Sequence, residues 1–169
     1  MPFVEIRRAL PEEAPELKAL MIASKGYWPY SDEWMAAWVS RLVLTAHYLP
    51  DHVDEVYVAV VESAIAGFYA LLPQGPLCIL DDLWVAPDRI RTGVGRRLFG
   101  HALQRAGELG ADQMEGEAEP NAAGFYLRMG AHHLRTTISR SGRTLPVMGL
   151  ASGAQRMPAD GAPTQQQTS

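Results

Sequence analysis

One segment constrains the fold of this chain more than any other, because it joins a strand to a glycine-rich helix start. Residues 77–85 are apolar except for Asp81 and Asp82, and Pro87 follows them, as expected for a strand that ends there. In residues 94–109 the apolar positions recur at the helical period, and Gly93 and Gly95 stand where this helix begins. The first turn of a helix leaves backbone N–H groups unpaired, and glycines let a phosphate approach them closely. The segment therefore predicts a phosphate-binding turn between a strand and a helix.

The charges around this turn indicate which kind of ligand it takes. The chain has 169 residues and a formal net charge of −4, yet four arginines surround the turn: Arg89, Arg91, Arg96 and Arg97. This local concentration predicts a polyphosphate ligand, whereas an acidic chain argues against nucleic acid or an anionic membrane as partner. A dinucleotide-binding fingerprint needs a third glycine or alanine where Leu98 stands, and no GxxxxGK[ST] phosphate loop occurs.

The remaining elements follow from the periods of the apolar residues and from the turn residues. Strands are expected at 4–8, 56–61, 64–72, 113–118, 133–139 and 144–150, and helices from residue 11, from the Ser31 cap to Pro50, and at 121–129. With the central segment, the order is β-α-α-β-β-β-α-β-α-β-β, which indicates an α/β fold with a mixed central β-sheet flanked by helices. We expect a single domain over 1–151. Because 152–169 is rich in Gly, Pro and Gln, we expect a flexible C-terminal tail there.

A second segment, EPNAAGFYLRMG at 119–130, gives the phosphate turn a family context. The two segments together resemble the GNAT superfamily of acyl-CoA-dependent N-acetyltransferases, and the resemblance spans residues 3–150. The matching residues are Leu83-Trp84-Val85, Pro87, Gly93-Val94-Gly95, Asn121, Phe125-Tyr126 and Gly130. One position departs from the family pattern, because Ile90 stands where the family has Gln or Arg, three residues before the first glycine.

The resemblance implies the GNAT fold and acetyl-CoA as cosubstrate. The pyrophosphate of CoA would lie on the glycine turn, and its pantetheine arm would bond the backbone of the strand that ends at Val85. One N–H of that strand would polarise the thioester carbonyl. The implied cofactor-binding residues are Leu83, Val85, Arg91, Thr92, Gly93, Val94, Gly95, Arg96, Asn121, Phe125 and Tyr126.

The resemblance also implies a general acid, Tyr126, which would protonate the departing CoA thiolate. A general base is sought among five carboxylates on or near the two central strands: Asp81, Asp82, Glu115, Glu117 and Glu119. We favour Asp82 and then Glu117, because Asp82 shares strand parity with Trp84, whereas Asp81 shares it with packed Leu83 and Val85. A water relay, or no base at all, stays open as an alternative.

An aromatic segment, SKGYWPYSDEW, joins the two N-terminal helices and predicts an acceptor pocket. Members of the family often use this region to bind the acceptor, and aromatic rings suit an amine. The candidate substrate-binding residues are Tyr27, Trp28, Tyr30 and Trp84. Ordinary aromatic packing at a helix junction is the alternative.

We therefore expect an N-acetyltransferase that moves an acetyl group from acetyl-CoA to a primary amine of a small molecule or peptide. The amine would attack directly in a ternary complex. The alternative is a non-catalytic acyl-CoA-binding regulatory module. No metal is expected, because the five histidines and the single cysteine, Cys78, lack metal-ligand spacing. One cysteine, no signal sequence and no apolar stretch of about 20 residues indicate a cytoplasmic protein without membrane or nucleic-acid partners, and a homodimer stays open.

Overall fold

The computed structural model describes residues 2–42, 55–139 and 142–152, which build one seven-stranded sheet. The strand order is β1-β2-β3-β4-β5-β7-β6. The β4–β5 pair is parallel and every other neighbouring pair is antiparallel, so the sheet is mixed, as expected from the sequence. In chain order the elements are β1 (Glu5–Arg8), η1 (Pro11–Glu13), α1 (Ala14–Gly26), α2 (Asp32–Val39), β2 (Val56–Val61), β3 (Ala64–Gln74), β4 (Leu77–Val85), η2 (Pro87–Arg89), α4 (Val94–Glu108), β5 (Gln113–Glu117), α5 (Ala123–Arg128), β6 (His132–Ile138) and β7 (Thr144–Ala151).

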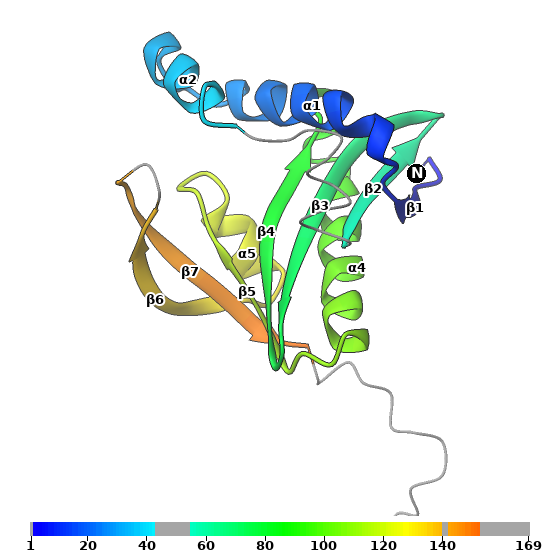
Figure 1. Cartoon of the computed structure of the whole chain (residues 1–169), viewed down its shortest axis with the longest axis vertical. Helices are drawn as coiled ribbons and strands as arrows, with labels where there is room; N and C mark the ends of the chain where they lie inside the picture. The colour runs from blue at the N-terminus through cyan, green and yellow to red at the C-terminus, as the bar shows by residue number, and fades with distance from the viewer. Residues whose placement is uncertain (1, 43–54, 140–141, 153–169) are drawn as a thin grey trace, which may run out of the picture.

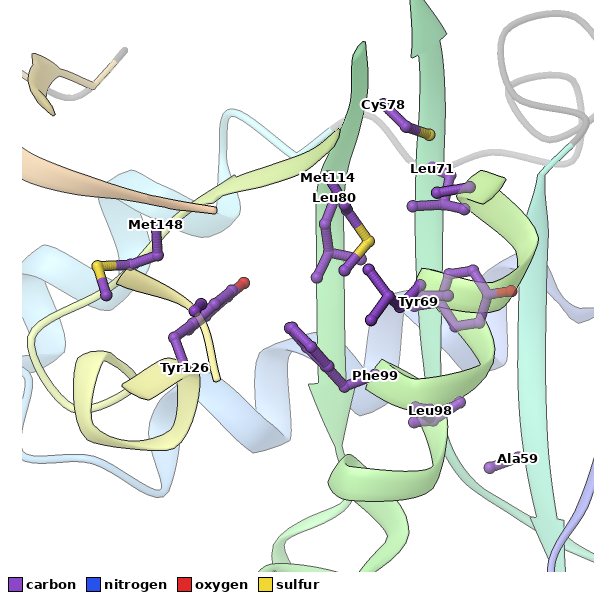
Figure 2. Close-up of a cluster of buried hydrophobic side chains, with 14 of the residues drawn as sticks. Ala59, Tyr69, Leu71, Cys78, Leu80, Leu98, Phe99, Met114, Tyr126 and Met148 are labelled. Carbon is purple, nitrogen blue, oxygen red and sulfur yellow. The ribbon is translucent and has the colours of Figure 1, made fainter. Parts of the chain in front are cut away.

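Two helices cover opposite faces of the sheet and give the protein three layers (Figure 1). Strand β3 supplies both faces in alternation: Phe68 and Ala70 pack under α1, whereas Tyr69 and Leu71 pack under α4. The α4 side holds the larger core, part of which is drawn in Figure 2. Because both faces of β2, β3 and β4 are covered, these strands read as nearly continuous apolar runs in the sequence.

Strands β4 and β5 pair only at their beginnings. Their parallel ladder runs from Leu77↔Gln113 to Ile79↔Glu115, although β4 continues for six residues beyond Ile79. On its other side, β5 pairs with β7 over its whole length. The two central strands therefore diverge, and the sheet opens between them.

A β-bulge lies in β4 just past the point of divergence. Ala70 pairs with Asp82, but the next residue of β3, Leu71, pairs with Leu80, so Asp81 is an extra residue in β4. The bulge resets the alternation of side chains, and Asp81 is exposed. The expectation that Asp81 packs in the core with Leu83 and Val85 is therefore wrong.

The order of helices and strands is confirmed, and the second helix is the main difference. Ser31 caps α2 as expected, because its Oγ accepts from the Trp34 N–H at 3.1 Å. The helix ends at Val39, well before Pro50, which lies outside the described residues. Ser40 ends it with a hydroxyl that donates to Ala37 O at 2.7 Å, the kind of local bond that competes with a helix. Ser152, expected at the start of the tail, is buried and donates to Ala111 O at 2.5 Å.

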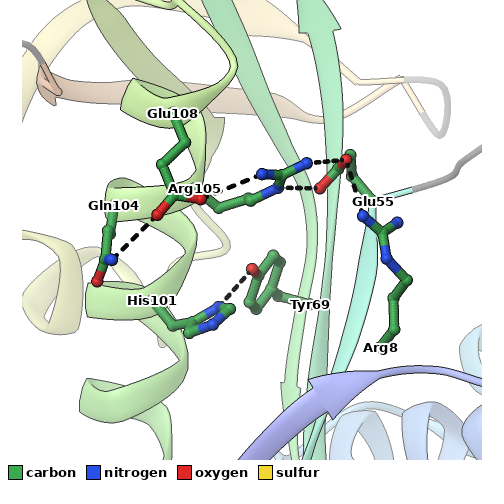
Figure 3. A network of polar contacts seen from close by, with 7 residues as sticks. All are labelled: Arg8, Glu55, Tyr69, His101, Gln104, Arg105 and Glu108. Carbon is green, nitrogen blue, oxygen red and sulfur yellow. Dashed lines mark hydrogen bonds and ion pairs between the residues drawn. The ribbon is translucent and has the colours of Figure 1, made fainter.

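A network of hydrogen bonds and ion pairs connects α4 to Glu55, the residue before β2, and to Arg8 of β1 (Figure 3). The Glu55 carboxylate is buried and accepts two bonds from Arg105, at 2.7 and 2.8 Å, while Arg8 of β1 reaches it at 3.5 Å. Burial would raise the pKa of Glu55, but the bonds and charge of Arg105 outweigh it, and the pKa is lowered. A carboxyl whose pKa falls on folding contributes stability at pH values above its unfolded pKa.

Arg105→Ala tests this network. The variant removes the two hydrogen bonds from Arg105, and the buried Glu55 carboxylate keeps only the weaker contact with Arg8 at 3.5 Å among the described residues. The free energy of unfolding at pH 7, measured by urea titration, should therefore fall by about 3 kcal/mol. The difference from wild type should shrink as the pH falls below about 4, where the carboxyl of the variant is protonated. Gln104→Ala, one residue away and bonded only to the exposed Glu108, is the control and should change little. Equal losses at pH 7 and pH 3 would contradict the electrostatic account.

Candidate functional site

A cavity of about 970 Å³ occupies the opening between β4 and β5. The second half of β4 lines it from Leu80 to Val85, α5 and the loop before it form another wall, and the glycine turn closes one end. Helix α1 contributes Ser24 and Lys25 from the opposite side. The cavity therefore joins the glycine turn to the aromatic segment, which lie far apart in the sequence.

The glycine turn presents the start of α4 to the cavity. Gly93 is the residue before the helix and has φ 94°, a left-handed conformation that glycine adopts without strain. Without a side chain, Gly93 cannot cap the first N–H groups of α4, which stay available to an anion. Arg91 and Arg96 line the cavity beside them. In the loop that precedes this turn, Arg89 forms an ion pair with Glu62 at 2.7 Å, which helps to hold the loop in place. This end of the cavity can bind phosphate groups.

Tyr126 of α5 reaches into the opening between the strands. Its ring packs edge-to-face on Phe99 at 5.8 Å and lies between Phe99 and Met148 in Figure 2. A Cβ added at Gly116 of β5 would lie 3.1 Å from the Tyr126 hydroxyl and 3.2 Å from Leu80 O, so the glycine leaves room for the hydroxyl. Burial, with the nearby Asp82 charge, raises the pKa of Tyr126. The phenol therefore keeps its proton at neutral pH.

Asp82 is the carboxyl with the most altered acidity in the described part of the chain. Burial raises the pKa of Asp82 to about 6, and the neighbouring Asp81 adds to this. A hydrogen bond from Trp84 Nε1 to Asp82 Oδ1, at 2.8 Å, works in the opposite direction. A carboxyl that titrates near neutral pH can accept a proton far better than an ordinary aspartate.

Glu119 is bound on several sides. Lys25 Nζ lies 3.0 Å from Oε1, and Oε2 accepts from Arg143 at 2.5 Å and from the Tyr30 hydroxyl at 3.1 Å. Burial would raise the pKa of Glu119, but its bonds to Lys25 and Arg143 outweigh this and lower it. Glu115 is also engaged, since it is buried and paired with Arg135 at 2.7 Å. The lowered pKa makes Glu119 a poor proton acceptor, and Glu115 is occupied by its pairing with Arg135.

Lys25 is almost completely buried in a cluster of aromatic rings. Its Nζ lies 4.8 to 5.7 Å from the centres of four rings: those of Tyr30, Trp34, Trp38 and Trp84. Burial lowers the pKa of Lys25, while the bond to Glu119 opposes the shift. The rings and the carboxylate together hold an ammonium group, an arrangement otherwise used to bind cationic ligands.

Most residues proposed from the sequence meet in this cavity. Those that line it are Asp82, Leu83, Trp84, Val85, Arg91, Gly93, Gly95, Arg96, Glu117, Asn121, Phe125, Tyr126 and Trp28. Four others do not. Tyr27 is half exposed, Tyr30 reaches Glu119 from outside the lining, Thr92 donates to Arg89 O at 2.5 Å, and Val94 is buried in the core.

Sequence reasoning missed Lys25. The residue stands four positions after Met21, on the buried side of α1, and two positions before Tyr27. A lysine on a buried stripe next to several aromatic residues is the signal that could have identified it.

No group of three or more His, Cys, Asp or Glu side chains that could hold a metal ion occurs among the described residues. Within residues 2–42, 55–139 and 142–152, no helix is long and apolar enough to cross a membrane.

Comparisons with known proteins agree with this geometry. Residues 52–130 match the family described as an acetyltransferase (GNAT) domain. The chain is 32% identical over 151 residues to the peptidyl-lysine N-acetyltransferase YjaB of Escherichia coli, covering 88% of this chain and 96% of that protein. Two solved structures are similar: PaiA N-acetyltransferase from Thermoplasma acidophilum with coenzyme A (TM-score 0.70, 16% identity, 88% of this chain and 99% of that one) and a GCN5-related N-acetyltransferase from Rhodopseudomonas palustris (TM-score 0.69, 25% identity, 89% and 97%).

The acidity of Asp82 can be measured without any ligand. In a pH titration of side-chain carboxyl resonances, Asp82 should ionise with a pKa of about 6. Trp84→Phe should raise this pKa further, because the variant loses the N–H that stabilises the carboxylate. Trp38→Phe changes a ring that packs against Trp84 at 5.8 Å but keeps that N–H, and should leave the pKa near the wild-type value. Equal shifts in the two variants would exclude the hydrogen bond as the cause.

Proposed function

We propose that this chain, which belongs to the GNAT family of acetyltransferases, transfers an acetyl group from acetyl-CoA to a primary amine. As a member of that family it is an acyltransferase, which disfavours the alternative of a non-catalytic acyl-CoA-binding module. One observation carries the proposal: the Tyr126 hydroxyl and the Asp82 carboxyl meet the same cavity as the open N-terminus of α4, where β4 and β5 diverge.

The donor side of the cavity suits CoA along its length. The pyrophosphate would accept bonds from the N–H groups after Gly93, with Arg91 and Arg96 beside it. Beyond Ile79 the backbone of β4 no longer pairs with β5, so the polar groups at Leu83 and Val85 can bond the amides of pantetheine. An N–H in this stretch would also stabilise the negative oxygen that forms when the thioester carbonyl is attacked.

The side chains at the opening supply the two proton transfers. The acceptor ammonium first loses one proton to solvent; the neutral amine nitrogen then attacks the thioester carbon and loses a second proton to Asp82, and the carbon–sulfur bond breaks. The CoA thiolate leaves with the proton of Tyr126. Burial raises the pKa of Tyr126, which makes it a weaker acid, but the same desolvation makes the departing thiolate more basic.

Among the carboxylates at the opening, the acidity and contacts favour Asp82 as the base. Glu119 is held by Lys25 and Arg143, and Glu115 is buried with Arg135. Glu117 lines the cavity but is exposed, so its environment is closer to water. Asp82 combines a place in the cavity with a raised pKa.

The acceptor is a primary alkyl amine, and a lysine side chain of a peptide is the form we favour. Support comes from the relative named as a peptidyl-lysine N-acetyltransferase. Asp81, Asp82 and Glu117 also give the cavity negative charge away from the glycine turn, which attracts an ammonium group to the place of reaction.

Acetyl-CoA should bind and stabilise the fold through the glycine turn. At 100 times its dissociation constant the ligand should add about 2.7 kcal/mol to the free energy of unfolding, measured as a rise in melting temperature. Gly93→Val should abolish the rise, because the side chain blocks the approach of the pyrophosphate. Gly110→Val is the matched control: φ there is 91°, so it suffers similar strain but should keep the ligand-dependent rise. Loss of the rise in both variants, or in neither, would remove the glycine turn from the donor site.

Tyr126→Phe removes one hydroxyl and should preserve packing. Turnover with a lysine-containing peptide should fall by roughly 10²- to 10⁴-fold, while acetyl-CoA affinity changes little. An acyl donor with a more acidic thiol should partly rescue the variant. Tyr69→Phe is the control, because Tyr69 is also buried but bonds His101 on the far side of β4 at 2.8 Å, and its turnover should stay within twofold of wild type. Full turnover in Tyr126→Phe would show that another group protonates the thiolate.

A further inference from the structure

The buried Lys25 ammonium is connected to Asp82 through a single ring. The ammonium lies 5.7 Å from the centre of the Trp84 ring, within the range of a cation–π contact. The same ring donates its N–H to Asp82 Oδ1 at 2.8 Å. The cation of α1 and the carboxyl of β4 thus contact the same indole.

The charges around Lys25 do not cancel. Glu119 is its ion-pair partner, at 3.0 Å, but the same carboxylate also binds Arg143. Two cations therefore share one carboxylate. The Lys25 side chain is 3% exposed, so water screens its charge less than that of a surface lysine, whereas Glu119 and Arg143 are partly exposed.

We propose that Lys25 is a positioning residue for the transfer reaction: its ammonium fixes the indole of Trp84 and, through the indole N–H, holds the Asp82 carboxylate in its ionised form. A cation over the face of an indole draws electron density from the ring and makes the N–H a better hydrogen-bond donor. It also restricts the rotation of the ring, which Trp38 packs from another side at 5.8 Å. The proposal rests on the proposed function of Asp82 as the base.

Other groups that share the cavity with Asp82 set the background. Asp81 is its neighbour on β4, Tyr126 lines the same cavity from α5, and Glu117 comes from β5. The arginines at the glycine turn and on α5 line the cavity as well: Arg91, Arg96 and Arg128. None of these is altered by a change at Lys25 or Glu119, so variants at these two positions isolate the effect of the cluster.

The experiment compares variants that disrupt the same ion pair with opposite effects on charge. Lys25→Met removes the cation, Glu119→Gln removes the anion, and Lys25→Arg keeps the cation. For each, the ionisation midpoint of Asp82 is followed by carboxyl NMR titration without ligands. The acidic limb of the pH profile of kcat/KM is measured with acetyl-CoA and a lysine-containing peptide. Lys25→Gln, which keeps a donor to Glu119 without the charge, replaces Lys25→Met where that variant does not fold.

Lys25→Met should move the midpoint and the acidic limb to higher pH by about 0.5 to 1 unit, because the carboxylate loses a stabilising charge and a strong donor. Glu119→Gln should move the Asp82 midpoint and the acidic limb to lower pH or leave them in place. Lys25→Arg, which keeps the cation, should show the wild-type midpoint and profile. Shifts in the same direction for Lys25→Met and Glu119→Gln, or none in either, would overturn the positioning role, since loss of packing alone affects both alike.

Asp82→Asn separates the two proposals. If it retains turnover, Asp82 is not the base and that part of the proposed function fails, whatever the midpoints do. If it loses turnover while the midpoints of the other variants stay fixed, the base assignment stands and the role of Lys25 is overturned.

Discussion

The short parallel ladder between β4 and β5 is the constraint on which the rest of the structure depends. Three residue pairs join the strands, and beyond Ile79↔Glu115 they diverge. Pairing of β5 with β7 holds the second strand on its own course, and β3 holds the first. Unpaired backbone inside a protein is costly unless a partner satisfies it. The opening therefore exposes a row of polar groups that suits an extended ligand, and the cavity is a direct result of the sheet topology.

Two glycines leave space at this opening, one for a side chain and one for a ligand. Gly116 has no side chain where the Tyr126 hydroxyl lies, and Gly93 adopts a backbone conformation that leaves the start of α4 open. The bulge at Asp81 turns the Asp82 and Trp84 side chains toward α1 while Leu83 and Val85 stay in the core on the α4 side. The glycine turn, Tyr126 and Asp82, to which we assign the donor site, the acid and the base, are thus brought together by backbone features more than by any single side chain.

Much of this was predictable from the sequence, and the exceptions have a common cause. Alternating and helical periods predicted the strands and helices, because these signals are local, and the glycine turn, Asn121 and Tyr126, which were singled out by motif, line one cavity. The bulge at Asp81 depends on the register with β3, which a strict alternation of side chains cannot reveal. The burial of Lys25 depends on Glu119 and Trp84, which are distant in sequence. The end of the cavity near Lys25 and the aromatic rings is built from such long-range contacts and was the least predictable.

Helix α2 has no buried residue; it supplies Trp34 and Trp38, two of the four rings around the Lys25 ammonium, and Trp38 also packs against the core on the α1 side. Its contact with the rest of the protein combines one cation with half-buried rings, whereas α4 packs through six buried side chains. Segments with few buried side chains open at a lower free-energy cost than a core does, so we infer that the end of the cavity lined by Trp38 is less rigid than the end at the start of α4.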